Sequence, residues 1–163
     1  MAQVDYFLKI DGVEAESTDK GKHAGEIEVE SFSWGETNSG TAGHGGGGGA
    51  GKVVSQDFHF VKKLDKSSSQ LFIACATGKH FKTAVLSARK AGGEQLDYFK
   101  VTMEDVLVSS YQIGGSAHSD VVPTDQVSLN FAKLEVSYKE QKADGSLGGE
   151  AKQKYDFAGN VKV

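Results

Sequence analysis

The sequence is poor in several residue types, and each shortage excludes a class of protein. It holds one cysteine, Cys75, so no internal disulfide can form. It holds one proline, Pro123, and no apolar run approaches the length that spans a membrane. The net charge of −4 leaves no basic stripe of the kind that binds nucleic acid. These features predict a protein with no membrane insertion of its own and no nucleic-acid partner.

Motifs for catalysis and for metal binding are also missing. No G-x-S-x-G elbow marks a hydrolase serine, and a lone cysteine cannot complete a thiolate metal site. The five histidines are scattered without the spacing of a zinc site. They are His23, His44, His59, His80 and His118. We therefore expect no enzyme, no cofactor and no metal, and we expect the histidines to lie on the surface or in loops.

The N-terminal segment MAQVDYFLKIDG has neither a charged start nor a long apolar stretch, so no secretory signal peptide is expected. A chain made in the cytoplasm without such a signal does not use the general secretory route. Export by a dedicated machine stays open. At 163 residues, a single domain over 1–163 is the natural expectation.

Glycine, by contrast, is abundant, and it gathers in the run TAGHGGGGGAGK from Thr41 to Lys52. Because glycine loses more backbone freedom than any other residue on ordering, such a loop is costly to fix in place. The stretch 46–52 matches the phosphate-binding pattern G-x-x-x-x-G-K, but Val53 stands where Ser or Thr must hold magnesium, and a strand-like segment follows instead of a helix. We interpret residues 39–51 as either a flexible loop or an arm that orders against a partner.

The rest of the chain predicts strands and one helix. The helix is expected at about 66–77, with a capping box from Ser67 to Gln70 and a left-handed cap at Gly78. Its inward face should carry Leu71, Phe72, Cys75 and Ala76, where Cys75 is a packing residue. Strands are expected over 4–10, 26–34, 52–61, 81–91, 96–113 and 125–141, with a weaker one over 150–157. The two longest exceed the usual strand and should bend between sheets.

One expected strand, 26–34, changes its hydrophobic phase midway. Ile27 and Val29 are apolar on one phase, and Phe32 and Trp34 take the other. A shift by one residue turns side chains to the opposite face, so we expect a bulge near Glu30–Ser31 or burial on both faces.

Polar residues at two places on this strand bear on its orientation. Glu26, Glu28 and Glu30 alternate, which is typical of a solvated face. Ser33 lies between two large aromatics, so it either marks the outer side of a half-buried strand or faces a hydrated channel.

Eight motifs in register, covering nearly the whole chain, carry a resemblance to a known family. In order they are DYFLKIDGVEAES (5–17), EIEVESFSWG (26–35), GGGGAGK (46–52), DKSSSQLFIACATGKH (65–80), RKAGG (89–93), DVLVSS (105–110), SLNFAKLEVSY (128–138) and QKADG (141–145). Together they resemble the haemolysin-coregulated protein (Hcp) family, the inner-tube subunit of type VI secretion systems in Gram-negative bacteria. Ser69 stands where relatives often have proline, and both residues fit the first turn of a helix.

The resemblance implies a mainly β fold like that of phage tail-tube proteins: a β-barrel of two packed antiparallel sheets with one flanking α-helix. It implies a homohexameric ring that stacks into a tube, a spike protein at the tip and a contractile sheath around it. Small effectors travel in the channel, and the protein itself is secreted as part of a virulence apparatus. Ser33 becomes a candidate for effector contact in the channel. The glycine-rich loop becomes a ring-stacking arm, with Thr41, His44, Gly46, Gly48 and Lys52 as its candidate residues.

Two other interpretations stay open. Some relatives carry enzymatic C-terminal extensions, whereas this sequence stops at Val163, soon after the last expected strand. A monomeric β-sandwich that binds carbohydrate or protein would share the strand pattern. Elution near the monomer mass in size-exclusion chromatography would favour that last alternative.

Overall fold

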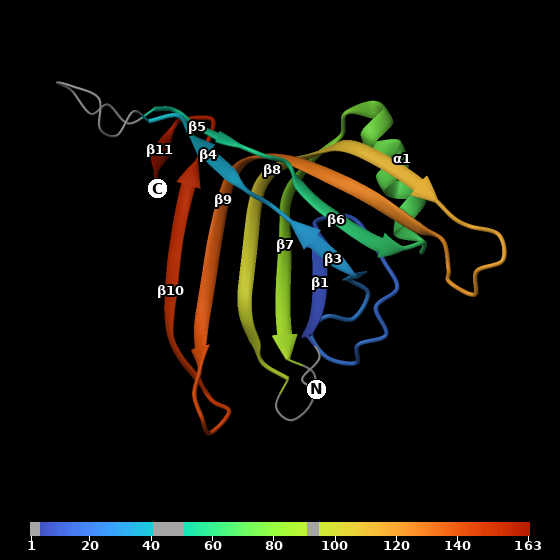
Figure 1. Cartoon of the computed structure of the whole chain (residues 1–163), viewed down its shortest axis with the longest axis horizontal. Coiled ribbons are helices and arrows are strands. Elements are labelled where there is room, and N and C mark those ends of the chain that lie inside the picture. The colour runs from blue at the N-terminus through green and yellow to red at the C-terminus, as the bar shows by residue number, and fades with distance from the viewer. Residues whose placement is uncertain (1–3, 41–50, 91–94) are drawn as a thin grey trace.

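The computed structural model describes residues 4–40, 51–90 and 95–163. The strands are β1 (Val4–Ile10), β2 (Ile27–Val29), β3 (Ser31–Ser33), β4 (Glu36–Asn38), β5 (Val53–Ser55), β6 (Phe58–Lys63), β7 (His80–Lys90), β8 (Asp97–Gly114), β9 (Thr124–Gln141), β10 (Leu147–Asp156) and β11 (Val161–Lys162). The helix α1 runs over Ser67–Thr77. Within the described residues no helix is long and apolar enough to cross a membrane. The mainly β architecture with one flanking helix confirms the expected fold class (Figure 1).

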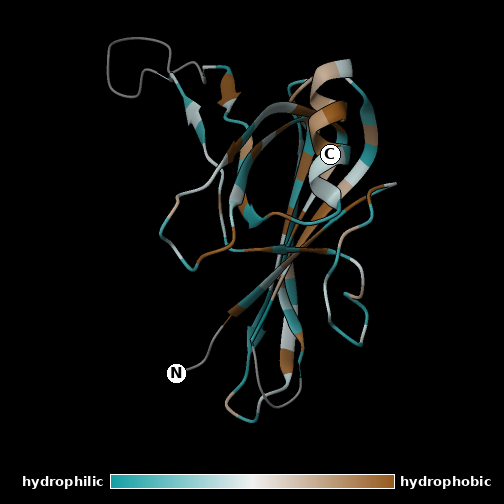
Figure 2. Ribbon diagram, turned by 90° about the vertical axis from the view of Figure 1, so that its right-hand side faces the viewer, coloured by the Kyte–Doolittle hydropathy of each residue, from teal (hydrophilic) through white to brown (hydrophobic). Residues whose placement is uncertain are grey.

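Two antiparallel sheets form this architecture. The larger has nine strands along the path β11-β10-β9-β8-β7-β1-β2, with β6 paired to β9 and β3 paired to β6. The smaller joins β4 and β5 in a hairpin that stands apart from the main sheet (Figure 2). The long strand β9 serves two parts of the larger sheet, because its first half pairs with β6 and its second half with β10. The predicted bend of the long strands needs correction, because β8 and β9 bend within the larger sheet and do not pass from one sheet to the other (Figure 1). A register shift between Val108 and Ser110 interrupts their ladder.

The predicted phase change in segment 26–34 is a change of partner strand. Strand β2 pairs with β1, opposite Tyr6, and β3 pairs with β6, opposite Val61. Between them the amide of Glu30 donates to the carbonyl of Val61 over 2.8 Å. The hydrogen-bonded sheet is open. The continuous segment from β2 to β3 nevertheless links the end of the path at β2 to the branch formed by β6 and β3, and this link gives the molecule a barrel-like core.

The core is one cluster of buried apolar side chains enclosed by the sheet and α1. Its fully buried larger members are Leu8, Ile10, Ile27, Phe58, Phe60, Leu71, Leu86, Met103, Val106, Val108 and Leu129. Alternation along β6 explains much of it, since Phe58 and Phe60 point inward and their neighbours point outward.

The bounds of α1 are as predicted, and Gly78 ends the helix with a positive φ of 67°. The predicted capping box is wrong, because the Asp65 carboxylate accepts from the Ser67 amide at 2.8 Å and the Ser68 hydroxyl accepts from the Asp65 amide at 3.1 Å. The predicted inward face is also wrong in part. Leu71 is buried, but Phe72 is 56% exposed. Ala74 replaces it in the core, as the i, i+3 spacing from Leu71 requires.

Candidate functional site

A set of polar side chains covers the outward face of β3, β6, the first part of β9 and the last part of β8. Cross-strand pairing arranges the set in two rows. One row is Ser31, Val61, Gln126 and Gln112, and the other is Ser33, His59, Ser128 and Ser110. We call these residues the polar wall. Because the inward neighbours Phe58 and Phe60 are fully buried, this side of the four strands is turned away from the core.

Apart from His59 and the aliphatic Val61, the side chains of the polar wall carry hydroxyl or amide groups. His59 is its only titratable member, and its Nδ1 lies 3.1 Å from the Ser128 hydroxyl. Asp57 borders the wall and accepts from Ser109 at 2.7 Å and from Asn130 at 3.0 Å. Such a surface offers many weak hydrogen bonds to a hydrated ligand. It differs from a Ser–His nucleophile, because among the described residues no carboxylate orients His59 through its second nitrogen.

Ser33 is exposed on β3, opposite His59. The aromatics on either side of it are half-buried, so the predicted alternation is confirmed. Phe32 stacks on Phe58 with ring centroids 5.7 Å apart, and Trp34 packs against Phe131 at 6.4 Å. These contacts fix the side to which the Ser33 hydroxyl points. Its role in effector contact stays a prediction.

A buried charge cluster supports the wall from inside. The Lys62 ammonium, fully buried, lies 3.0 Å from both Asp65 and Asp125. The Tyr111 hydroxyl donates to Asp125 at 2.9 Å. Burial first, and this bond to a carboxylate second, raise the pKa of Tyr111 to about 12. The cluster ties α1 to β6, β8 and β9, because Lys62 also donates to the Ser68 hydroxyl at 2.9 Å.

The hairpin strands β4 and β5 flank the glycine-rich segment in the sequence, and they pair from Glu36 opposite Ser55 to Asn38 opposite Val53 (Figure 1). At the end of this ladder the Asn38 side chain donates to the Gly51 carbonyl over 2.9 Å. A side chain at Gly51 would place Cβ 2.7 Å from the Ser39 hydroxyl oxygen, so the two arms of the hairpin come too close here for any residue but glycine. Lys52 is exposed beside it. The other stacking candidates, Thr41, His44, Gly46 and Gly48, lie outside the described residues.

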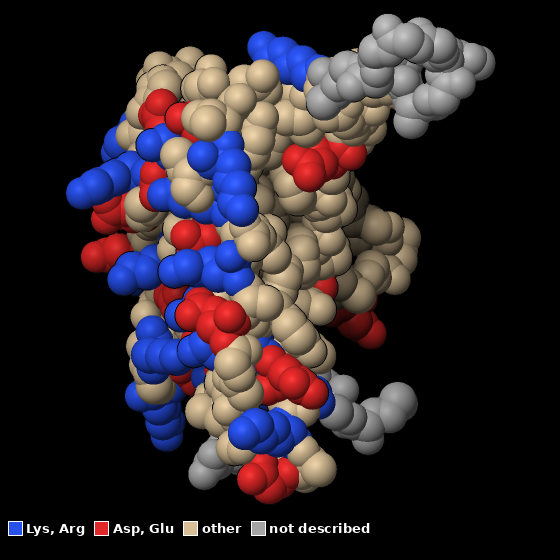
Figure 3. Space-filling model, turned by 90° about the vertical axis from the view of Figure 1, so that its left-hand side faces the viewer, with Lys and Arg blue, Asp and Glu red and all other residues tan. Residues whose placement is uncertain are grey.

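The other halves of β8 and β9, together with β10, present a different outer surface. Acidic and basic side chains alternate there across the strands, with Glu104 opposite Lys133 and Glu135 opposite Lys154. Figure 3 shows these charges interleaved over the side formed by β10. We call this surface the charged lattice. Its clearest ion pair joins Lys154 to Glu104 at 2.7 Å, and this hydrogen bond raises the pKa of Lys154.

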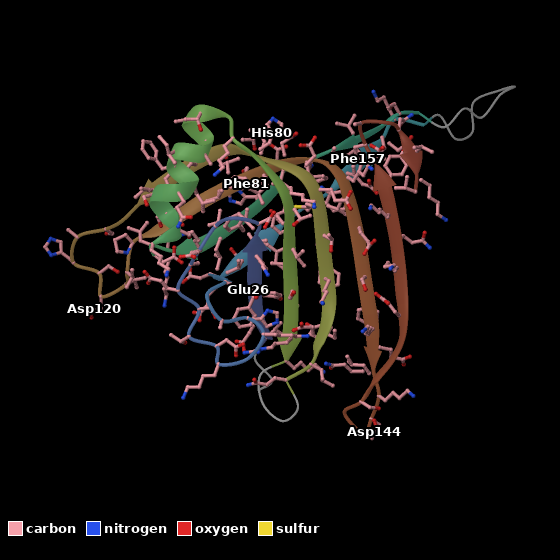
Figure 4. The ribbon with its side chains drawn as sticks, turned by 180° about the vertical axis from the view of Figure 1, so that it is seen from behind. Glu26, His80, Phe81, Asp120, Asp144 and Phe157 are labelled. Carbon is pink, nitrogen blue, oxygen red and sulfur yellow. The ribbon has the colours of Figure 1, made fainter. Side chains whose placement is uncertain are left out.

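A second buried charge cluster lies behind β1 and corrects one prediction. His23 lies in the loop before β2, as expected, but it is only 4% exposed, and its ring stacks on Phe7 at 4.5 Å. Its Nδ1 lies 2.6 Å from Glu26 and its Nε2 2.9 Å from Asp97. Glu26, labelled in Figure 4, is therefore covered by the loop that holds His23, and of the three glutamates only Glu28 and Glu30 are exposed.

The same cluster continues into a cleft of about 770 Å³ beside β1. Arg89, on β7, donates to Asp19 at 2.8 Å and lies over the Phe7 ring at 4.6 Å. The hydrogen bond from Arg89 keeps the pKa of Asp19 below its usual value. These contacts hold the loop before β2 against the sheet. The charged side chains Arg89 and Asp19, which line the cleft, are thus paired with each other.

Sequence reasoning found Ser33 but missed the rest of the polar wall. The signal was present in β6, where Phe58 and Phe60 alternate with Asp57, His59 and Val61. No local pattern could pair that strand with β9, because the partners Phe58 and Leu129 are far apart in the sequence. The cluster around His23 was missed for the same reason, since Asp97 is far away in the sequence.

Comparison with known proteins agrees with this architecture. Residues 7–138 match the family described as type VI secretion system effector, Hcp. Protein hcp1 of Pseudomonas aeruginosa is 50% identical over 162 residues, covering 98% of this chain and 99% of that protein. The crystal structure of Hcp1 from Salmonella typhimurium, 36% identical, superposes with a TM-score of 0.83 over 100% of both chains. A structure of a type six secretion system protein, 29% identical, reaches 0.93 over 99% of this chain and 100% of the other.

The polar wall, the projecting hairpin and the flanking helix thus occur in a fold shared along the full length of these relatives. The resemblance seen in the eight sequence motifs is confirmed. The chain belongs to the Hcp family of type VI secretion proteins.

Proposed function

We propose that this chain is the repeating subunit of a type VI inner tube, in which six copies form a ring with the polar walls facing the channel. Rings stack into a tube inside a contractile sheath and behind a spike protein, and the tube is expelled with effectors in its channel. The single observation that carries the ring is the polar wall together with its two unpaired edges.

Those edges lie at opposite sides of the wall. In the described part of the chain, β3 pairs only with β6, and the ladder between β7 and β8 stops at Leu107. The far edges of β3 and of Ser109–Gly114 are therefore open, which is a state that proteins usually avoid. Because the four strands alternate in direction, β3 and β8 run antiparallel to each other. Copies placed side by side would continue the antiparallel pattern around a ring.

Apolar side chains beside the β8 edge favour the same arrangement. Ile113 is 57% exposed, and Phe72 packs on Tyr111 with ring centroids 6.3 Å apart while remaining more than half exposed. A head-to-tail interface joins two different faces of the subunit and closes into a ring when the rotation allows. The apolar surface next to one edge would then be covered by the neighbour.

The ring is tested by native mass spectrometry of Ile113→Lys. A lysine at the β8 edge should disfavour assembly by placing charge in an apolar contact, leaving monomers with the circular dichroism of the parent. Val163→Lys is the matched control, because Val163 is similarly exposed, at 58%, at the end of the chain. A wild-type protein that stays monomeric over a wide concentration range would overturn the ring and favour a monomeric binding module.

The stacking role of the loop is a separate part of the proposal. The glycine-rich sequence between β4 and β5 suits an arm that loses its conformational entropy only on assembly, and the hairpin stands apart from the main sheet (Figure 2). Deleting residues 41–49 should leave rings intact and abolish tubes in negative-stain images. Tubes formed by the shortened protein would remove the arm, with Thr41, His44, Gly46, Gly48 and Lys52, from the stacking surface.

Effector binding is the third part. Ser33 lies in the row of the wall that contains His59, so a bulkier side chain there projects into the proposed channel. Ser33→Gln should reduce co-purification of effectors while rings persist. Thr37→Gln, on the exposed hairpin strand β4, is the control. Retention unchanged by Ser33→Gln would exclude this residue from effector contact. We propose that the protein acts by binding and enclosing cargo, without catalysis.

A further inference from the structure

His59 is the one side chain of the polar wall that can change its charge near neutral pH. The other members carry hydroxyl, amide or aliphatic groups. An imidazole gains a positive charge within the range from about pH 8 to pH 5, whereas hydroxyl and amide groups do not titrate there. His59 therefore differs in kind from the residues beside it.

Few charged side chains lie near His59 on the elements that pack against it. Along β6, Asp57 lies two residues before it and the exposed Lys63 four residues after it. From β3 it faces Ser33, with Glu30 exposed beyond the other end of that strand, and from β9 it faces Ser128. Asp57 is already engaged by Ser109 and Asn130.

The contact between His59 and Ser128 is compatible with a neutral and with a protonated imidazole. The Ser128 hydroxyl lies 3.1 Å from Nδ1, and a hydroxyl can donate to a neutral imidazole or accept from a protonated one. The bond therefore survives in both charge states. Within the described residues, Nε2 of His59 has no hydrogen-bond partner, so this nitrogen is the one left for a ligand.

We propose that His59 determines which cargo the wall prefers, by offering Nε2–H and a positive charge to carboxylates of the cargo as the pH falls. This inference rests on the proposed ring. Rotational symmetry would bring six His59 side chains to one level of the channel, so that protonation adds as many as six positive charges there. Acidic cargo is then held more tightly at mildly acidic pH, and neutral cargo is held equally at both pH values.

The test uses purified rings and two peptides, one of ten glutamates and one of alternating glycine and serine, both labelled with an uncharged dye whose emission does not depend on pH. Glutamate side chains remain mostly ionised at about pH 5.5. Anisotropy should show the affinity for the glutamate peptide rising about fivefold or more from about pH 7.5 to 5.5, because like-placed charges add in a narrow channel. The affinity for the neutral peptide should stay constant.

Two variants assign the effect. His59→Gln keeps a hydrogen-bonding side chain without the charge and should flatten the pH dependence to less than about twofold. His118→Gln alters an exposed histidine in the loop after β8 and should behave as the parent. Equal pH dependence in parent and His59→Gln rings would overturn the inference while the ring stands. Absence of rings in native mass spectra would instead overturn the proposed function on which it rests.

Discussion

Strands β8 and β9 each run through two surfaces of opposite character. Their paired stretch near β10 carries the charged lattice, with Glu104 opposite Lys133, and their paired stretch near β6 carries the polar wall, with Ser110 opposite Ser128. The register shift between Val108 and Ser110 separates them. Where the outer surface is charged, the ion pair between Lys154 and Glu104 is partly exposed to water. Where it is uncharged, the charge lies inside, in the cluster around Lys62. The charged lattice and the polar wall therefore differ in whether their charged side chains lie on the outer surface or in the interior.

The largest expected effect on stability comes from removing one partner of the buried cluster around Lys62. Lys62→Met should lower the free energy of unfolding by about 3–5 kcal/mol, because it leaves the carboxylate of Asp125 buried without its cation. Urea denaturation followed by the fluorescence of Trp34, the single tryptophan, measures the loss. A change below about 1 kcal/mol would mean that water or rearrangement compensates the buried charge.

The matched variant in the charged lattice is Lys154→Met. The side chains of its ion pair with Glu104 are 28% and 36% exposed, so that salt and water screen much of the attraction. The same urea measurement should show no resolvable change. A loss as large as that of Lys62→Met would contradict the distinction between the two regions.

The cluster around His23 should contribute an intermediate amount to the free energy of unfolding, and this contribution should depend on pH. Burial raises the pKa of Asp97, but the hydrogen bonds from Lys22 and His23 more than offset burial, so the pKa lies below its ordinary value. Stability from this group is therefore fully present above about pH 4 and is lost as the pH falls through the lowered value. Asp97→Asn should cost about 2 kcal/mol at neutral pH.

The change in stability of Asp97→Asn on acidification tests this assignment. The variant should lose less stability than the parent on acidification below about pH 4, because the carboxylate that must be protonated is gone. Thermal melts of both proteins at a series of pH values measure the two slopes. Parallel slopes would show that other carboxylates cause the acid sensitivity.

Different features of the molecule can be predicted from the sequence to different extents. Strand positions, the ends of α1 and the break near Glu30 follow from local patterns, namely apolar alternation, Gly78 and the switch from Val29 to Phe32. The inward face of α1 does not, because the run LFIACA is apolar all round and only the packed sheet selects Leu71 and Ala74. Burial of His23 and assembly of the polar wall depend on pairing between distant strands, which no local pattern contains.

The smallest expected effect sharpens the description of the charged lattice itself. The Ser137 hydroxyl donates to Glu150 at 2.6 Å, and this bond first, followed by nearby lysines, holds the pKa of Glu150 below its usual value despite some desolvation. Ser137→Ala should raise that pKa toward the ordinary range, as NMR titration of the Glu150 carboxyl would show. Ser137→Thr keeps a hydroxyl and should retain part of the depression. A pKa unchanged by Ser137→Ala would assign the depression to Lys100, Lys139 and Lys152, and the lattice would then act as a field of charges more than as a set of specific hydrogen bonds.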